Sequence, residues 1–199
     1  MGRIAVDVVL LPDETMADKA VEANAELVKR FGSEIVLHKE NCLPHISLAM
    51  GSIDERDVAS IEKVLTKVAE RCAVGELKII GIYTSTNARS ETVSVFEVEK
   101  TRELQILHEK VMEKVKPYFS NVVTGDMIYG EEEVADTTLE WIKSYRENAS
   151  FTKFFPHITI GYGNTEEQEF PIKFAVSKLA LCHLGNHCTC RKVLSAIEL

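Results

Sequence analysis

The chain contains two closely similar nine-residue segments, at residues 43–51 and 155–163. Each runs in the order apolar residue, Pro, His, Ile, hydroxyl residue, aliphatic residue, two further residues and Gly. Alternating aliphatic and polar residues predict a β-strand, in which every second side chain shares a face. Each His is then expected on the same face as the hydroxyl residue that follows it, while the aliphatic residues turn toward a core.

Two strands that each present an imidazole beside a hydroxyl predict one site built from two halves. The pairs are His45 with Ser47 and His157 with Thr159. Imidazole has an unperturbed pKa of about 6.5, so it can accept or donate a proton near neutral pH. Hydroxyl groups can donate hydrogen bonds to the oxygens of an anion. We therefore expect acid–base chemistry on an anion such as a phosphate.

The shorter pattern His-x-Ser/Thr occurs a third time, at His187-Cys188-Thr189. This copy lacks the preceding Pro, the following aliphatic residue and the closing Gly, and it lies at a predicted hairpin turn. Tripeptides of this kind arise by chance, whereas the two long segments match over nine positions. We interpret residues 187–189 as a chance match.

A chain of 199 residues is long enough for one domain, or one domain with two lobes, and for a substantial core. Its formal net charge of −8 argues against nonspecific binding along a nucleic-acid backbone, although a local pocket for one phosphate remains compatible. The apolar run at residues 1–11 is interrupted by Asp7, and no segment is long enough to span a membrane. We expect a cytoplasmic protein that does not bind membranes.

Residue periodicity predicts a mixture of strands and helices, with residues 120–133 left ambiguous. The order strand, helix, His strand, helix, strand occurs first, and a looser version follows: strand, helix, uncertain segment, His strand, strand. This repetition predicts two related lobes, and short links between strands favour antiparallel pairing. The chain contains neither a glycine-rich phosphate loop nor a dinucleotide-binding fingerprint. Besides the two segments, the expected strands are 3–11, 34–38, 77–84, 92–98 and a closing hairpin of 170–183 with 187–198; the expected helices are 13–31, 54–68, 101–116 and 134–146.

The doubled His-aliphatic-Ser/Thr-aliphatic pattern resembles the 2H phosphoesterase superfamily, in particular its 2′-5′ RNA ligase and cyclic nucleotide phosphodiesterase branch. The resemblance covers most of the chain, taken as a single domain over residues 1–199. It implies an α+β fold of two pseudo-twofold-related lobes, with antiparallel sheets lining a central cleft and helices packed outside. The segment 120–153 is longer than the simplest members need, so we expect it to form a lid or wall over the cleft.

The resemblance implies that His45, Ser47, His157 and Thr159 are the catalytic residues and that no metal or cofactor is required. The implied reaction is hydrolysis of a 2′,3′-cyclic phosphodiester of an RNA end or small nucleotide, with His157 as base and His45 as acid. Ligation to a 2′,5′ linkage would use the same groups in exchanged roles. Nucleotide, RNA, tRNA-processing and ADP-ribose-type substrates all remain open, as does the oligomeric state.

Aromatic and cationic side chains are needed to stack on a base or hold a phosphate. The candidates for substrate binding are Tyr83, Arg89, Tyr129, Lys153 and Tyr162. One alternative function is a non-catalytic nucleotide- or RNA-binding module on the same fold, and another is an interaction scaffold that presents an amphipathic helix at residues 134–147.

The five Cys residues allow further interpretations. An odd number predicts reduced intracellular thiols rather than a disulfide framework. Zinc could bind four of the five potential ligands in segment 182–190, although their spacing matches no common zinc pattern, and alternation along a hairpin puts Cys188 and Cys190 on a face that His187 does not share. Small buried thiols are the other interpretation. Cys42 is a possible nucleophile, but Pro44 separates it from His45 and no orienting third group is evident.

Overall fold

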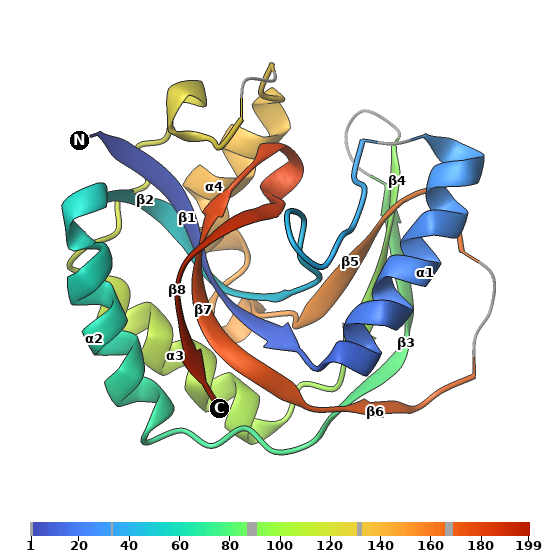
Figure 1. Cartoon of the computed structure of the whole chain (residues 1–199), viewed down its shortest axis with the longest axis horizontal. Helices are drawn as coiled ribbons and strands as arrows, with labels where there is room; N and C mark the ends of the chain where they lie inside the picture. The colour runs from blue at the N-terminus through green and yellow to red at the C-terminus, as the bar shows by residue number, and fades with distance from the viewer. Residues whose placement is uncertain (1, 33, 87–90, 131–132, 166–168) are drawn as a thin grey trace.

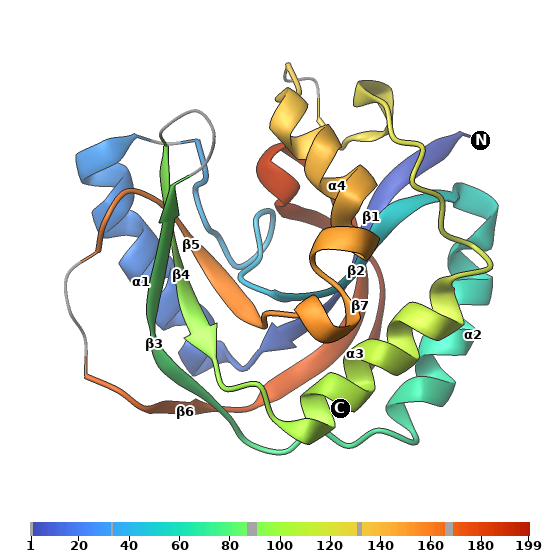
Figure 2. The same cartoon turned by 180° about the vertical axis from the view of Figure 1, so that it is seen from behind.

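The computed structural model describes residues 2–32, 34–86, 91–130, 133–165 and 169–199. Two antiparallel four-stranded sheets form two lobes, seen side by side in Figures 1 and 2. The first sheet has the strand order β2 (Ile46–Asp54), β1 (Arg3–Pro12), β7 (Val176–Leu184), β8 (Cys190–Glu198). The second has the order β5 (His157–Tyr162), β4 (Thr92–Val98), β3 (Leu77–Thr86), β6 (Ile172–Phe174). The predicted α+β class with two pseudo-twofold-related lobes is confirmed.

The α-helices flank the sheets, and two of them cross between the lobes. They are α1 (Glu14–Phe31), α2 (Val58–Ala69), α3 (Arg102–Val115) and α4 (Asp136–Asn148). Helix α1 follows β1 of the first sheet but packs on β5 of the second, and α3 follows β4 of the second sheet but packs on β2 of the first. Each lobe therefore covers the His strand of the other. Within the described residues, no helix is both long and apolar enough to cross a membrane.

The two His strands are built on the same hydrogen-bond register. In the first sheet Val9 pairs with Ser47, and in the second Val95 pairs with Thr159. Each ladder then shifts by one residue, so that Leu48 and Ile160, each three residues after its His, have no register partner. Such a shift bends a strand and redirects its side chains. The doubled sequence is therefore matched by a doubled bulge.

A buried polar side chain on each exchanged helix bonds to the carbonyl at this bulge. In one lobe the Asn24 amide donates to Ile160 O (2.9 Å), and its oxygen accepts from the Leu37 amide (2.8 Å). In the other, His108 Nδ1 donates to Leu48 O (2.9 Å), and its Nε2 accepts from the Phe151 amide (2.8 Å). Each side chain thus joins the His strand of one segment to the chain that leads into the other.

The glycines that close the two segments are required by close packing. A Cβ at Gly51 would lie 2.9 Å from the ring of Phe119 and 3.0 Å from a backbone oxygen. Gly163 has a φ of 103°, and a Cβ there would lie 2.1 Å from the ring of Phe31. An L side chain at either position would force its neighbour to move.

Two predicted strands differ in the structure. Residues 34–38 form no strand beyond an isolated bridge from His38 to Cys42 among the described positions, because the Asn24 side chain takes up Ile35 O and Leu37 N in place of a neighbouring strand. The strand predicted for residues 170–183 is divided at Ala175. The Asp13 amide donates to the Ala175 carbonyl, and the Ala175 amide donates to the Asp13 carboxylate. The part before Ala175 becomes β6 in the second sheet, and the part after it becomes β7 in the first.

The cysteines also differ from expectation. Cys182 and Cys190 form a disulfide between β7 and β8, so the prediction of five reduced thiols is wrong for this pair. Their Cα atoms are 5.7 Å apart, an ordinary disulfide separation that only the strand pairing creates. The alternation assumed for the hairpin, which put Cys188 and Cys190 on one face, is interrupted because His187 and Cys188 have φ values of 57° and 55°. Cys188 lines a cavity whose described lining does not include Cys190.

Candidate active site

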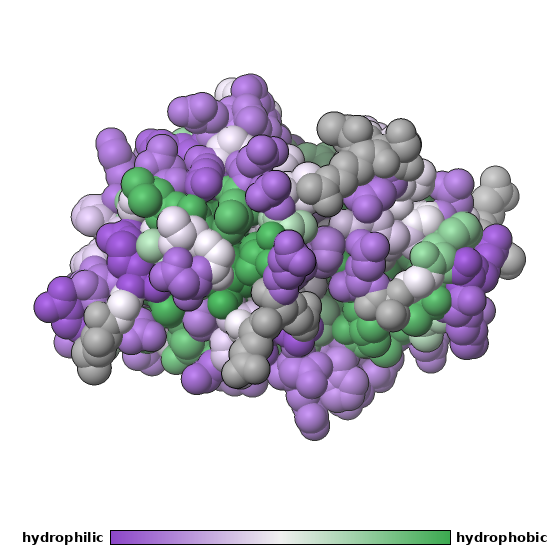
Figure 3. Space-filling view, turned by 90° about the horizontal axis from the view of Figure 1, so that it is seen from above, coloured by the Kyte–Doolittle hydropathy of each residue, from purple (hydrophilic) through white to green (hydrophobic). Residues whose placement is uncertain are grey.

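A cavity of about 490 Å³ receives side chains from both lobes. His45 precedes β2 directly and His157 is the first residue of β5. Both line this cavity together with Ser47 and Thr159, so the structure brings all four predicted residues to one place. The aliphatic residues of the same strands are fully buried on the opposite face, as the alternation predicts. Figure 3 shows the molecule from above, where hydrophobic residues are exposed between regions of hydrophilic surface.

The two imidazoles are held in the same way. His45 Nδ1 lies 2.7 Å from Leu43 O, and His157 Nδ1 lies 2.8 Å from Phe155 O. A carbonyl can only accept, so Nδ1 carries the hydrogen in both rings and Nε2 is the nitrogen left for chemistry. The Pro between each carbonyl and its His keeps the preceding residue extended and thereby fixes the carbonyl. This is the physical role of the Pro in each segment.

Burial controls the proton affinity of both rings. It lowers the pKa of His45 to about 4, and the nearby His157 adds to the shift because two positive charges would repel. Burial also lowers the pKa of His157. The side chain of His45 is 13% exposed, which leaves one edge open to the cavity. Burial therefore disfavours the protonated form of both rings.

A carboxyl group that the sequence analysis did not assign lies beside His45. Asp7 is completely buried on β1, and its Oδ2 is 3.9 Å from His45 Nε2. Neither of its oxygens has a partner at hydrogen-bonding geometry. Burial raises its pKa well above the usual range, against smaller opposing effects of the Ser47 hydroxyl and the Ala49 and Leu48 backbone. The only sequence signal for this group is that Asp7 interrupts an apolar strand.

Helix α4 and the short helix η4 (Asn186–Cys188) supply a wall that the sequence analysis located only in part. Trp141 and Tyr145 of α4 line the cavity, and the Tyr145 hydroxyl donates to Ser47 O at 3.3 Å. Asn186 Oδ1 accepts from the Ala135 amide and the Thr138 hydroxyl, which attaches α4 to η4. Residues within 120–153 therefore reach the cavity; their action as a lid remains a prediction.

The third tripeptide also reaches this wall, in a different setting. His187, Cys188 and Thr189 line the cavity, so the match that we attributed to chance has a place beside the site. His187 Nδ1 does not meet a backbone carbonyl as the other two do; it lies 3.0 Å from the Tyr162 hydroxyl. Only the two long segments share the arrangement that leaves Nε2 free.

The predicted substrate-binding residues are divided by the structure. Tyr83, Lys153 and Tyr162 line the cavity. Tyr129 does not; its ring packs edge-on against His183, with centroids 5.3 Å apart. Arg89 lies outside the described residues. Phe155, which the sequence analysis did not single out, lines the cavity and packs against both Tyr83 and His157, with ring centroids 5.4 Å away in each case.

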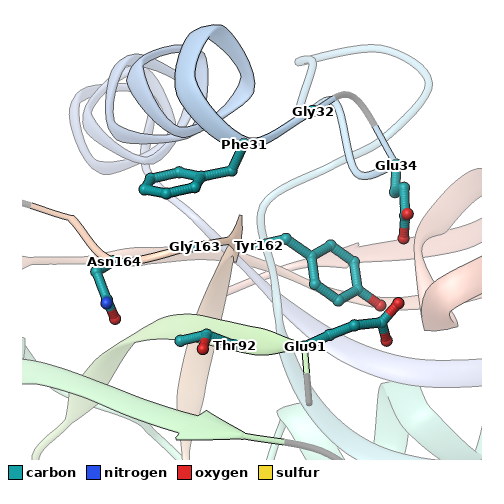
Figure 4. A pocket seen from close by; sticks show the side chains of 8 residues that line it. All are labelled: Phe31, Gly32, Glu34, Glu91, Thr92, Tyr162, Gly163 and Asn164. Carbon is teal, nitrogen blue, oxygen red and sulfur yellow. The ribbon is translucent and has the colours of Figure 1, made fainter. Parts of the chain in front are cut away.

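Tyr162 also borders a second, smaller cavity of about 260 Å³ (Figure 4). Its ring points toward Glu34 and Glu91, while the Phe31 ring lies over Gly163. Glu34 lies 3.9 Å from Nε2 of His187, the imidazole that contacts Tyr162 on its other nitrogen. Tyr162 thus lines both cavities, and its hydroxyl contacts His187 of η4.

The structure bears on both cysteine alternatives. Bonding between Cys182 and Cys190 removes two of the five ligands on which the zinc interpretation depends. Within the described ranges, no group of three His, Cys, Asp or Glu side chains is placed to hold a metal ion. Cys42 lines the cavity, but burial raises its pKa, against a smaller effect of Arg191, and so disfavours the thiolate needed for nucleophilic attack.

Two lobes that each bring a Pro-fixed imidazole and a hydroxyl to a shared cavity define the two-histidine phosphoesterase class. Residues 18–187 match the family described as the 2′-5′ RNA ligase superfamily. The chain belongs to this superfamily, which confirms the predicted resemblance and indicates a 2H phosphoesterase or ligase-like enzyme.

Solved structures share the fold at low sequence identity. A Thermus thermophilus protein, TT0787, is 17% identical, covers 98% of both chains and superposes with a TM-score of 0.65. Escherichia coli LigT in its apo form is 15% identical, covers 100% of this chain and 99% of its own, and superposes with a TM-score of 0.51. No curated protein matches the sequence.

Proposed function

We propose that the protein hydrolyses 2′,3′-cyclic phosphodiesters by acid–base catalysis between His157 and His45, without a metal ion. The observation that carries this proposal is the pair of imidazoles on one cavity, each with Nδ1 bonded to a carbonyl and Nε2 available. Opening a cyclic phosphate requires removal of a proton from water and delivery of a proton to the departing ribose oxygen. Two imidazoles supply both transfers.

The base role suits His157, in agreement with the family resemblance. Its burial lowers its pKa, so the ring is neutral and able to accept a proton near pH 7. Nε2 of His157 takes a proton from the attacking water as its oxygen bonds to phosphorus. The bond from phosphorus to one ribose oxygen breaks, and that oxygen receives a proton from His45, which leaves a phosphomonoester. Ser47 and Thr159 donate hydrogen bonds to the non-bridging oxygens, whose charge changes during the reaction.

The cavity favours a nucleotide or a short RNA end as substrate. Its volume of about 490 Å³ falls within the usual range for small-molecule sites, about 300–1,000 Å³. Lys153 is the only lysine or arginine among the described lining residues, which suits one phosphate better than a long polyanion. E. coli LigT, which shares the fold, has been crystallised with phosphate and with 3′-AMP. The same groups in exchanged roles would catalyse the reverse reaction, 2′-5′ ligation.

The test is turnover in the presence of a chelator. The purified protein is incubated with the four 2′,3′-cyclic nucleotides and with RNA ending in a cyclic phosphate. We expect His45→Ala and His157→Ala each to lose at least about 100-fold in kcat. His38→Ala is the control, because His38 is exposed outside the cavity. Full activity in both cavity variants would refute the mechanism, and binding of 3′-AMP without any turnover would favour the non-catalytic binding module.

A further inference from the structure

Comparison of equivalent positions in the two pseudo-twofold-related lobes shows one chemical difference in the strands that pair with the two histidine strands. Asp7 pairs with Met50, which lies five residues after His45. Val93 pairs with Tyr162, which lies five residues after His157. Asp7 and Val93 therefore occupy equivalent places in two ladders that share the same bulge. A carboxyl group occupies this position in one lobe, and a hydrocarbon side chain occupies it in the other.

Asp7 is costly to bury, and its surroundings offset that cost only in part: the Ser47 hydroxyl and the backbone of Leu48 and Ala49 favour the carboxylate, but burial outweighs them. The side chain is 0% exposed, and neither carboxyl oxygen has a hydrogen-bond partner. Buried polar groups in native proteins are nearly always satisfied, so an exception calls for an explanation. The side-chain nitrogen facing it is His45 Nε2, at 3.9 Å from Oδ2. This distance exceeds a hydrogen bond, so Nε2 also remains free to meet an oxygen in the cavity.

We propose that Asp7 and His45 share one proton, and that this pair, rather than His45 alone, constitutes the general acid of the site. The delivery step rests on the proposed function, whereas the pair itself does not. Asp7 acts through His45 and lies outside the described lining of the cavity, so it is a positioning residue.

The pair resolves a difficulty that burial creates for His45. A buried imidazole with a pKa of about 4 is almost never protonated at pH 7, so by itself it seldom holds the proton that a general acid must donate. Asp7 is the opposite case, because burial keeps its carboxyl protonated at higher pH. An anionic phosphate entering beside His45 stabilises the arrangement in which the proton has moved from Asp7 to the imidazole. Either arrangement has no net charge.

The proton balance closes over one turnover. Asp7 transfers its proton to Nε2 of His45, after an approach of about 1 Å to hydrogen-bond distance. Nε2 then delivers it to the departing ribose oxygen, while His157 holds the proton removed from water. At the end of the turnover, His157 releases its proton to solvent and the Asp7–His45 pair takes one up. No oxidant, reductant or further reactant is required.

Other titratable groups also face the pair. Tyr145 approaches from α4 and Cys188 from η4. The pKa of each is raised by burial, with a further increase from Asp7 when its carboxyl is ionised. His157 faces His45 from β5 and lowers its pKa. In the neighbouring strand, Cys182 pairs with Asp7 but is oxidised to the disulfide and does not titrate. Tyr145 and Cys188 therefore stay neutral over the range in which the pair exchanges its proton.

The first test does not depend on any substrate. The ring nitrogens of the ¹⁵N-labelled full chain are followed by NMR from pH 4 to 9, with His45 assigned through His45→Gln. In the wild type we expect His45 to titrate in two steps, one acidic and one above neutrality, because coupled groups titrate as a pair. In Asp7→Asn and in Asp7→Val, which copies the other lobe, we expect a single acidic step. Val93→Asn is the matched control and should retain both steps.

The second test compares pH–rate profiles on a 2′,3′-cyclic nucleotide. For Asp7→Asn we expect the alkaline limb of kcat to move at least about one unit toward acid, with a loss of about tenfold or more at pH 8 and a smaller loss at pH 5. A purely structural role would lower kcat equally at every pH. A single-step His45 titration in the wild type, or an unshifted limb in Asp7→Asn, overturns the proposal. Two-step titration in a protein without turnover would preserve the pair and refute the proposed function.

Discussion

The two histidine strands share a framework but differ in their chemical surroundings. Both have the same ladder shift and the same Nδ1-to-carbonyl hydrogen bond. The lobes differ in the residues that surround these strands. Asp7 in the first lobe corresponds to Val93 in the second. The bulge carbonyl accepts a hydrogen bond from His108 in the first lobe and from Asn24 in the second. The symmetric part of the molecule holds the two imidazoles in the same way, whereas the proposed sharing of a proton between Asp7 and His45 would make the lobes differ in the number of protons they hold. On this proposal, equivalent positions perform opposite halves of an acid–base reaction.

The largest expected effect is on kcat, and its pH dependence should distinguish the role of His45 from that of His157. Replacing either ring by Asn should lower kcat by about 10² to 10⁴. His157→Asn should also lose the acid limb, because the group that must be neutral is gone, while His45→Asn should lose the alkaline limb. The measurement is kcat from pH 4 to 9 on a 2′,3′-cyclic nucleotide. If each variant lost the other limb, the roles of the two lobes would be exchanged.

The next effect concerns the two buried side chains that join the lobes. His108→Ala should destabilise the protein by about 3 kcal/mol, because a buried carbonyl and a buried amide lose their partners and the ring leaves a cavity against Phe154. Asn24→Ala should cost about 2 kcal/mol or more, since Ile160 O and Leu37 N lose theirs. Urea unfolding measures both. A loss confined to one variant would mean that the lobes are joined on one side only.

These two side chains should differ in how their contributions depend on pH. Burial lowers the pKa of His108 to about 4, below the unfolded value of about 6.5. The folded state therefore binds fewer protons than the unfolded chain, and stabilisation present above pH 6.5 is lost as pH falls through 4. The deficit of His108→Ala should shrink by about 1.4 kcal/mol per pH unit across this window. The deficit of Asn24→Ala should stay constant, because an amide does not titrate.

Binding of the substrate's nucleobase can be tested by comparing KM for variants of an aromatic residue that lines the cavity and of one outside it. Trp141 and Tyr129 are each 43% exposed, but only Trp141 lines the cavity. If the base stacks on α4, Trp141→Ala should raise KM about fivefold or more, on the scale of one stacking interaction. Tyr129→Ala should change KM less than twofold. Tyr83→Ala tests the opposite rim, and an effect there alone would place the base against the second lobe.

The smallest expected effect is a gain in stability from Asp7→Asn. Burial raises the folded pKa of Asp7 above its unfolded value of about 3.9, so the folded state binds more protons and loses stability as pH rises from about 4 through the folded pKa. Removing this titration should stabilise the variant by about 1 kcal/mol at pH 8, or about 3 °C in Tm, and by almost nothing at pH 4. Thermal unfolding at the two pH values measures it. A gain independent of pH would indicate a packing effect.

Local pattern predicted the two histidine strands well, because every relevant property recurs within nine residues. Alternation identified the cavity side for His45 and the core side for Ile46, and the same holds for His157 and Ile158. The Pro before each His restricted the chain locally. Agreement between two copies made the assignment stronger than either copy alone.

Features that depend on distant pairing escaped prediction. Asp7 is a single charge in an apolar strand, and its meaning arises from a neighbour 38 positions away, which only the fold brings within 3.9 Å. The Cys182–Cys190 bond depends on the register of β7 against β8. Residues 34–38 have the composition of a strand, but the Asn24 side chain satisfies their backbone. No local window contains these partners.

The exchange of α1 and α3 between the lobes has a consequence for how the protein could be divided. A fragment ending before β3 would carry the first motif but leave its covering helix on the other fragment, with apolar strand surface exposed to water. Neither piece would be an independent folding unit, although the two expressed together could reassemble. Evolution by tandem copying of a half-sized ancestor would then have required that ancestor to work as an intertwined homodimer.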